Sequence, residues 1–372
     1  MSLIFIGIGI YLILYAVKRI YAENWNKGIA ASLEFSAKEV YPGEQIVITE
    51  TIANHSWLPL PMINVKFAID RNLVFGAGMD NASVSDKSYK CDVFSLLFFQ
   101  KITRRLPFTC TKRGYYYVEE MDVVSTDLFM KNVVSVSYPV NQSITVFPEP
   151  ISSEQVDIPY NCIMGTILTR RYTYEDPFEF RSIREYQTYD TMRSINWTAS
   201  ARTGDLKVNV YEHTASQEVC ILLNLESEGI WEYEVLKEKS ISMACSLAFR
   251  LTKQGVGVSI ISNGVDTVTG QEMHIACGSD EGHRRTIVTN LSRIDLKKDM
   301  KEFASLLEEN KKQLLQGAML VMISACKKEQ LQKRYQELAV GGVDSFWVLP
   351  HLAGMDCNVE YYNKGNIIRW EV

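Results

Sequence analysis

The sequence lacks the signatures of the common enzyme classes. Its 372 residues include only five histidines, and they contain no His-Glu-x-x-His pair, no Gly-x-Ser-x-Gly elbow and no Walker A loop. The eight cysteines stand singly, without a Cys-x-x-Cys pair, which argues against a zinc site or a disulfide framework. We therefore expect buried free thiols in a reducing compartment, no cofactor and no metal. The cysteines are Cys91, Cys110, Cys162, Cys220, Cys245, Cys277, Cys326 and Cys357.

An excess of positive charge is also absent. The formal net charge is −5 at pH 7, with 39 basic and 44 acidic residues. A protein that binds nucleic acid has to neutralise phosphates with clustered lysine and arginine, so nucleic acid is not the expected partner. The length is sufficient for two or three domains, each with its own core.

One apolar run stands apart, at the N-terminus. Residues 3–17 carry no charge, and Lys18 and Arg19 follow at once. Crossing a bilayer takes about 20 residues, so the flanks have to contribute, and we expect a transmembrane anchor over residues 1–22. A cleaved signal peptide is the alternative, but the chain does not start with basic residues. Because the basic residues follow the apolar run, we expect a single pass in the cell membrane with the bulk of the chain in the cytoplasm.

Residues 31–148 have the pattern of an all-β domain. Runs such as QIVITETIAN and INVKFAI are rich in β-branched residues and are separated by turn-forming Pro, Gly and Asn. Short strands at this spacing predict a β-sandwich of immunoglobulin-like architecture. The tract that follows, residues 149–178, is polar, and we interpret it as an irregular linker or covering arm.

Residues 179–372 combine a polar stretch with alternating strands and helices. Four apolar runs are predicted to be buried strands: VCILLNL, VGVSIIS, AMLVMIS and VDSFWVL. Residues 232–253 and 327–339 are predicted to be helices. Asp299 looks like the cap of a further helix, and residues 363–366 like the turn of a C-terminal hairpin. The alternation predicts an α/β domain with a mostly parallel sheet covered by helices.

The polar stretch from Phe180 to Glu212 has the densest set of specific-looking residues. Asp190 is a good N-cap for a helix over the following residues, on which Arg193 and Trp197 would share one face. Thr203-Gly204-Asp205 would end that helix, and residues 206–211 alternate like a strand. From Arg170 to Glu212, acidic and basic residues are equal in number, which suggests a buried network of ion pairs. The residues of interest are Arg181, Arg184, Tyr186, Asp190, Arg193, Trp197 and Arg202.

This stretch resembles the signature of the family known as domain of unknown function 58. The pattern is roughly Arg-x-Tyr-x-x-Gly-Asp-x-x-Arg-x-Ile-x-Trp-x-x-x-Ala-Arg, and Tyr189 departs from it where the family has glycine. The resemblance implies that the α/β domain is von Willebrand A-like and that the partner is a MoxR-type AAA+ ATPase. The residues that match in register are Arg184, Tyr186, Asp190, Arg193, Ile195, Trp197, Ala201 and Arg202.

A von Willebrand A-like domain usually carries a metal site, Asp-x-Ser-x-Ser, after its first strand. Oxygen ligands are required there because Mg²⁺ is a hard cation. Here Asn224 replaces the leading carboxylate, while Glu226 and Glu228 replace the two hydroxyls. A second acidic ligand would follow AMLVMIS, where the sequence has Ala325. We expect that the metal site is lost and that both glutamates face solvent. A rearranged site that uses Glu226 and Glu228 as ligands is the alternative.

Two functions fit these features. The first is a membrane-anchored adaptor or scaffold that binds a protein partner in envelope or complex maturation. The second is an enzyme with an unrecognised site around Arg184, Asp190 and Arg193. The enzyme is the weaker reading, because a carboxylate between two guanidiniums stays charged and is a poor general base near neutral pH. Exposure or burial of these side chains discriminates a binding surface from a structural brace.

Overall fold

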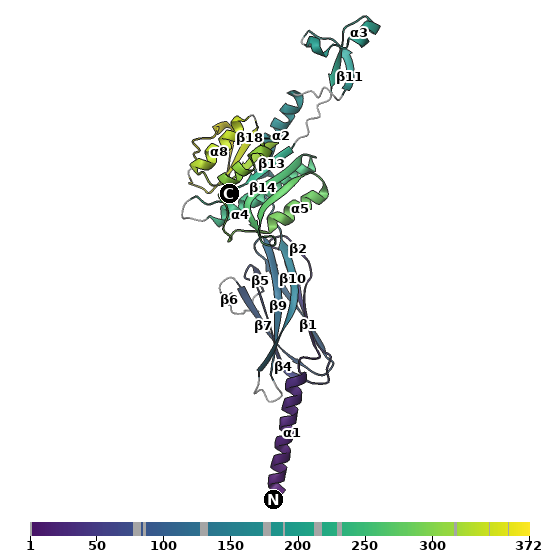
Figure 1. Ribbon diagram of the computed structural model, residues 1–372, viewed down its shortest axis with the longest axis vertical. Coiled ribbons are helices and arrows are strands. Elements are labelled where there is room, and N and C mark those ends of the chain that lie inside the picture. The colour runs from purple at the N-terminus through teal and green to yellow at the C-terminus, as the bar shows by residue number, and fades with distance from the viewer. Residues whose placement is uncertain are drawn as a thin grey trace. The chain divides into compact units, whose positions relative to one another are not determined.

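The computed structural model in Figure 1 divides into two compact units, which we describe separately. The first comprises Met1–Glu149 with Leu291–Arg293, and the second Pro150–Asn290 with Ile294–Val372. The description covers residues 2–76, 83–84, 87–126, 133–173, 180–188, 190–211, 218–228, 233–315, 318–341, 343–355 and 357–372.

The first unit begins with helix α1, Ser2–Asn24. Among the described residues it is the one helix long and apolar enough to cross a membrane. Its last turn is joined to the β domain, because Tyr21 is buried and its hydroxyl donates a hydrogen bond to the Pro59 carbonyl (3.2 Å). Trp25, just beyond the helix, is buried as well. The expected apolar helix is confirmed.

Two sheets with one common core make up the rest of the first unit. Inward-facing residues such as Ile48 and Phe108 from one sheet and Val65 and Val123 from the other belong to the same cluster of buried side chains. The expected β-rich domain is confirmed. The four-stranded sheet runs β1 (Ile29–Phe35), β3 (Gln45–Asn54), β8 (Lys101–Cys110), β5 (Leu73–Phe75). The six-stranded sheet runs β2 (Glu39–Val40), β10 (Val133–Val146), β9 (Gly114–Thr126), β4 (Leu60–Asp70), β7 (Lys87–Leu96), β6 (Ser83–Val84).

A group of charged side chains is buried between these two sheets. Glu50 on β3 is only 1% exposed, and Lys90 and Asp92 on β7 are buried beside it. Asp92 accepts from Arg104 on β8 (2.7 Å) and lies 3.7 Å from the Lys90 ammonium. Burial, followed by the nearby Asp92 carboxylate, raises the pKa of Glu50 to about 7. At neutral pH this carboxyl group therefore exists in both the protonated and the charged form.

The second unit begins with a helix where we expected an irregular tract. Helix α2, Ser153–Thr173, occupies most of residues 149–178, so the expectation of an irregular linker was wrong. Val156, Ile163 and Ile167 are buried, at helical spacing, and α2 packs on helix α4, Glu234–Lys253. The Arg250 guanidinium of α4 lies 4.4 Å from the centre of the Tyr160 ring. These contacts place α2 against the α/β body.

A mixed sheet forms the body of the second unit. Strands β14, β13, β17, β18 and β19 are mutually parallel, whereas β15 and β16 pair antiparallel with β14. This confirms a mostly parallel sheet with helices. The strands in sheet order are β15 (Glu272–Gly278), β14 (Gly257–Asp266), β13 (Glu218–Leu223), β17 (Met319–Ile323), β18 (Ser345–His351) and β19 (Ile367–Glu371), with β16 (Ile294–Asp295) beside β14.

Helices cover this sheet. On one face of the sheet, Cys220 and Leu222 of β13 share a core with helices α6 and α8. Side chains alternate along a strand, so Ile221 and Leu223 face the opposite side, where α4 packs on the same strands. The other helices beside this sheet are α5 (Glu281–Ser292), α6 (Phe303–Glu309), α7 (Lys311–Leu314) and α8 (Glu329–Val340). The helices expected over 232–253 and 327–339 correspond to α4 and α8.

Three smaller expectations were wrong. Asp299 does not cap a helix, since α6 begins at Phe303. Residues 364–366 form a 3₁₀ turn, η2 (Lys364–Asn366), that leads into β19; because β19 runs parallel to β18, the C-terminus is not a hairpin. The cysteines are all free, but only part of them is buried; Cys91, Cys162 and Cys277 are exposed.

Candidate functional site

The residues of the family signature form a small unit around a two-stranded sheet. Strand β11 (Phe180–Glu185) pairs antiparallel with β12 (Lys207–Tyr211), and the chain between them contains the 3₁₀ turn η1 (Met192–Ser194) and helix α3 (Trp197–Thr203). We call this segment, Phe180–Tyr211, the signature hairpin. The expected strand and the helix end at Gly204, which adopts a left-handed conformation (φ 82°), are confirmed.

Arg184 and Asp190 form the central contact of the signature hairpin. The guanidinium donates two hydrogen bonds to the carboxylate, at 2.7 Å (Nη1 to Oδ2) and 2.5 Å (Nη2 to Oδ1). The Gln187 backbone N–H donates to the same carboxylate (2.8 Å). These interactions, above all the hydrogen bonds from Arg184, lower the pKa of Asp190. The carboxylate is therefore held charged and occupied, which agrees with its being a poor general base.

The continuous helix expected after Asp190 was wrong. Ile195 and Asn196 have extended backbones, which separate η1 from α3. The N-cap of α3 is Asn196, whose side-chain oxygen accepts from the Ala199 N–H (2.9 Å). Asp190 therefore does not cap a helix, and Arg193 and Trp197 do not share a helical face. The helix is instead capped six residues later, at Asn196, by a hydrogen bond that the Asn196 side chain accepts.

Exposure within the signature hairpin is uneven. Ile195, Val208 and the backbone-bonded Ser200 are buried. Trp197 is 64% exposed and Met192 75% exposed. Of the buried brace of Arg184, Asp190, Arg193 and Trp197 that we expected, only the Arg184–Asp190 pair is formed, and its Arg184 side chain is 38% exposed. Arg193, Arg202, Ile183 and Leu206 are exposed and Tyr186 half-buried; the Arg181 side chain and Tyr189 lie outside the described residues.

A second group of expected site residues meets at the carboxyl ends of the parallel strands. Asn224, directly after β13, is almost fully buried. Its Nδ2 donates to Ser324 Oγ (3.0 Å), and its Oδ1 accepts from the Glu226 N–H (3.0 Å) and from Asn263 Nδ2 (3.2 Å). Asn263 Oδ1 in turn accepts from the Leu225 N–H (3.0 Å). This buried amide network connects the ends of β13, β14 and β17.

Contrary to our expectation, Glu226 does not face solvent. Its Oε1 accepts from the Phe303 N–H at the start of α6 (2.7 Å), and its Oε2 lies 3.6 Å from the Lys328 ammonium. The side chain is only 9% exposed. Glu226 thus stabilises a helix N-terminus, where a negative charge is favourable. Glu228 is exposed, as expected.

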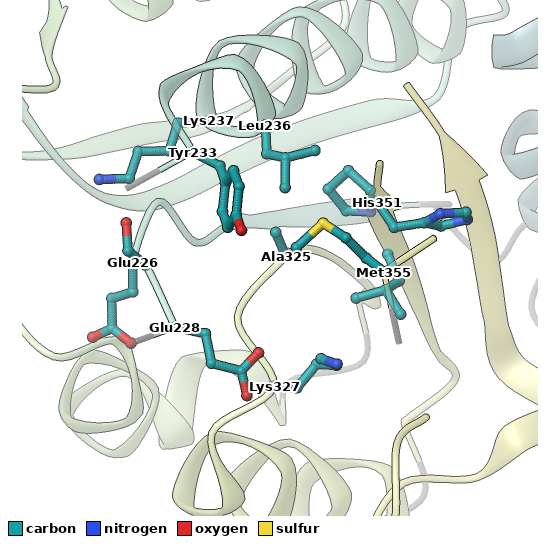
Figure 2. Close-up of a pocket in the computed structure, with 12 residues that line it drawn as sticks. Glu226, Glu228, Tyr233, Leu236, Lys237, Ala325, Lys327, His351 and Met355 are labelled. Atoms are coloured by element: carbon teal, nitrogen blue, oxygen red, sulfur yellow. The ribbon is translucent and has the colours of Figure 1, made fainter. Parts of the chain in front are cut away.

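A pocket of about 270 Å³ opens beside this network. Among the residues that line it are Tyr233, Ala325 and Met355, which Figure 2 shows between the two glutamates and His351. Ala325, at the position where a second acidic ligand was sought, offers no ligand atom on its side chain. Across the described parts of the chain, no group of three or more His, Cys, Asp or Glu side chains is arranged to hold a metal ion.

The comparisons with known proteins identify a family. Residues 182–342 match the family described as "Protein of unknown function DUF58". This segment, which contains most of the signature hairpin and much of the α/β body, therefore belongs to that family, as the resemblance predicted. The family description assigns no activity. No curated protein matches the chain.

Similar solved structures are distant. The CARDB domain of a Pyrococcus furiosus protein, solved with di-metal ions, is 15% identical and matches 32% of this chain and 91% of its own (TM-score 0.22). A non-cellulosomal cohesin from Archaeoglobus fulgidus is 14% identical over 36% of this chain and 97% of its own (TM-score 0.23). The sporulation control protein Spo0M from Bacillus subtilis is 8% identical over 43% of this chain and 58% of its own (TM-score 0.20). Likenesses this distant indicate no function.

The sequence analysis missed the charged group around Glu50. A signal was present, because Ile46, Ile48, Glu50 and Ile52 alternate along β3 with the same parity. A glutamate in a row of inward-facing isoleucines is expected to be buried. Its partners Asp92 and Arg104 come from other strands, and no local pattern indicates that they meet it.

Proposed function

We propose that this protein is a membrane-anchored binding protein that recognises a protein partner through the signature hairpin. The observation that carries the proposal is the exposure of Trp197 and Met192, together with exposed Arg193, beside the hydrogen-bonded Arg184–Asp190 pair. Tryptophan and arginine dominate the energetic centres of protein interfaces. Large apolar side chains exposed together on a small segment are typical of an interaction site.

The partner that we propose is a MoxR-type AAA+ ATPase, in a system for envelope or complex maturation. Its basis is the association of the family with such ATPases, which the sequence resemblance implies. We further propose that the β domain is immunoglobulin-like and the α/β body von Willebrand A-like. The central parallel strands with an antiparallel edge strand and flanking helices support the second assignment.

An enzyme with a site around Arg184, Asp190 and Arg193 is the alternative. The bidentate hydrogen bonding of Asp190 and its lowered pKa speak against a general base at this position. We therefore favour binding over catalysis, and the first test is directed at binding.

Replacing Trp197 by alanine is expected to weaken partner binding strongly without affecting stability. An exposed indole at the centre of an interface contributes roughly 2 kcal/mol or more to binding, which weakens affinity about 30-fold. The measurement is pull-down of the ATPase by the full chain purified in detergent, together with thermal unfolding. Trp57→Ala is the matched control, because Trp57 is equally exposed (66%) but lies in the first unit. Undiminished capture by Trp197→Ala would exclude the signature hairpin as the binding surface.

The orientation in the membrane is a separate prediction. Because Lys18, Arg19 and Lys27 follow the apolar run of α1, the β domain and the α/β body should lie in the cytoplasm. Protease added outside intact cells should then leave the chain uncut, whereas permeabilised cells should lose it. Cleavage from the outside would contradict the orientation and, with it, an ATPase partner inside the cell.

A further inference from the structure

Two loops at one end of the β domain carry exposed aromatic and aliphatic side chains. Trp57 lies between β3 and β4, and Leu97, Phe98 and Phe99 lie between β7 and β8; Phe99 is 71% exposed. The loops are bonded to each other, since the Phe99 N–H donates to the Ser56 carbonyl (3.3 Å) and Asn54 Nδ2 donates to the Leu97 carbonyl (3.0 Å). We call Trp57 with residues 97–99 the loop patch.

The loop patch lies at the end of the β domain to which α1 is attached. Leu60 pairs with Leu96 at the start of β4, and Asn54 ends β3 opposite the start of β1. The chain enters β1 directly from α1, and the His55 N–H donates to the Gly28 carbonyl (2.6 Å). The Tyr21 hydroxyl bond to the Pro59 carbonyl fixes the last turn of α1 to the loop that carries Trp57.

The charge pattern of α1 places this end of the domain close to a bilayer surface. The uncharged run of the helix ends at Val17, and the ion-paired Arg19 and Glu23 are exposed. Tyr21, which already contacts the β domain, is four residues beyond Val17, or about 6 Å along a helix. A headgroup layer is of about this thickness, roughly 5–8 Å per leaflet. The β domain therefore begins within the headgroup layer of the bilayer.

Two further properties of the loop patch suit a lipid surface. Tryptophan and phenylalanine are favoured at the boundary between hydrocarbon and water, where a ring can be buried beside polar headgroups. Phe99 also adopts a positive φ of 56°, a conformation that costs free energy for a bulky residue and that glycine or asparagine would adopt more readily. A phenylalanine at this turn is explained if its side chain has a binding role.

We propose that the loop patch inserts into the interfacial layer of the membrane beside α1, so that the β domain is held against the lipid surface at a second point. This inference rests on the proposed role of α1 as a membrane anchor. Rigid attachment would follow, because a helix and two loops on one domain restrict its tilt more than a helix alone.

The test uses the full chain reconstituted into phosphatidylcholine vesicles whose acyl chains carry bromine next to the headgroups. Bromine quenches tryptophan fluorescence on contact, and comparison of the unsubstituted protein with Trp57→Phe isolates the emission of Trp57. We expect a quenched component that is lost in Trp57→Phe and retained in Trp197→Phe, the control for an exposed indole in the other unit. The double variant Phe98→Ser/Phe99→Ser should shift the remaining Trp57 emission to longer wavelength and reduce its quenching.

Flotation of the vesicles tests membrane anchoring by α1 separately from insertion of the loop patch. Protein that floats with the vesicles but shows the same quenching with and without Trp57 would overturn the loop insertion and leave α1 as the anchor. Protein that does not float with the vesicles would overturn the anchor and the insertion together. Quenching of Trp57 in floating vesicles supports both.

Discussion

Replacing Glu50 by glutamine is expected to stabilise the first unit by about 3 kcal/mol at pH 8 and to have little effect near pH 4. The pKa of this buried carboxyl is raised from 4.5 to about 7. One pKa unit corresponds to about 1.4 kcal/mol, so charging Glu50 in the folded state costs about 3 kcal/mol more than in the unfolded chain. Glutamine has the shape of the protonated acid but does not become charged.

The direction of the pH effect follows from the raised pKa. The folded state binds the proton more tightly than the unfolded state, so the contribution of Glu50 is fully present below about pH 4.5. It declines as the pH rises to about 7 and stays lost above that value. Asp92, Lys90 and Arg104 are the charged groups that face Glu50, and in the part of the chain described both of its oxygens and Asp92 Oδ2 lack a hydrogen-bond donor. A proton on Glu50 supplies a donor for Asp92.

Hydrogen exchange of the β3 and β8 amides, corrected for intrinsic exchange rates, measures the stability of this domain at each pH. The difference between Glu50→Gln and the unsubstituted protein should grow from pH 4 to pH 8. Glu34→Gln is the control, because Glu34 is an exposed carboxylate on the neighbouring strand β1. A difference that does not change with pH would show that Glu50 does not titrate in this range.

Replacing Asn224 by alanine is expected to destabilise the second unit by about 3 kcal/mol. The change removes the acceptor of the Glu226 N–H and of Asn263 Nδ2 and the donor to Ser324 Oγ, all at a site that is almost fully buried. Each buried polar group left without a partner costs about 1–3 kcal/mol. Thermal and urea unfolding measure the loss.

A double-mutant cycle provides the control. Asn224→Ala and Asn263→Ala remove the same hydrogen bond, so their combined effect should be smaller than the sum of the single effects. Mg²⁺ is not expected to raise the melting temperature of the unsubstituted protein, whereas a ligand at a hundred times its dissociation constant would add about 2.7 kcal/mol. A cost below about 1 kcal/mol for Asn224→Ala, or stabilisation by Mg²⁺, would contradict a structural role for the amide network.

The regular parts of the fold were predictable because their periodicity is local. The continuous apolar run VCILLNL and the alternating run QIVITETIAN each indicate how the segment is buried, and the strands β13 and β3 are found there. Helix α2 was missed because Pro159, Gly165 and polar residues obscure its buried row of Val156, Ile163 and Ile167. Its helical state depends on the packing of that row on α4, which no local pattern reveals.

The sequence predicted where the residues of the candidate site meet, but not which contacts each side chain makes there. The positions after β13 and β17 were expected to meet, and Glu226, Glu228 and Ala325 do line one pocket. The role of Glu226 depends on the Phe303 N–H, 77 residues further along the chain. In the signature hairpin, Asp190 was expected to cap the helix, whereas Asn196 does so. Both residue types are favoured at N-cap positions, so residue type alone does not locate the helix start.

The strands of the first unit also make it a spacer. The chain enters this domain from α1 at the start of β1 and leaves it through β10, whose last residue, Val146, pairs with Gly114 at the far end of β9. Strand β9 has 13 residues, and at about 3.3 Å per residue it spans about 40 Å. Residues after Val146 therefore start about that far from the end of α1. A partner that can reach no more than the first 10 Å or so above that end would miss them, and shortening β9 and β10 would reduce the distance without altering any binding residue.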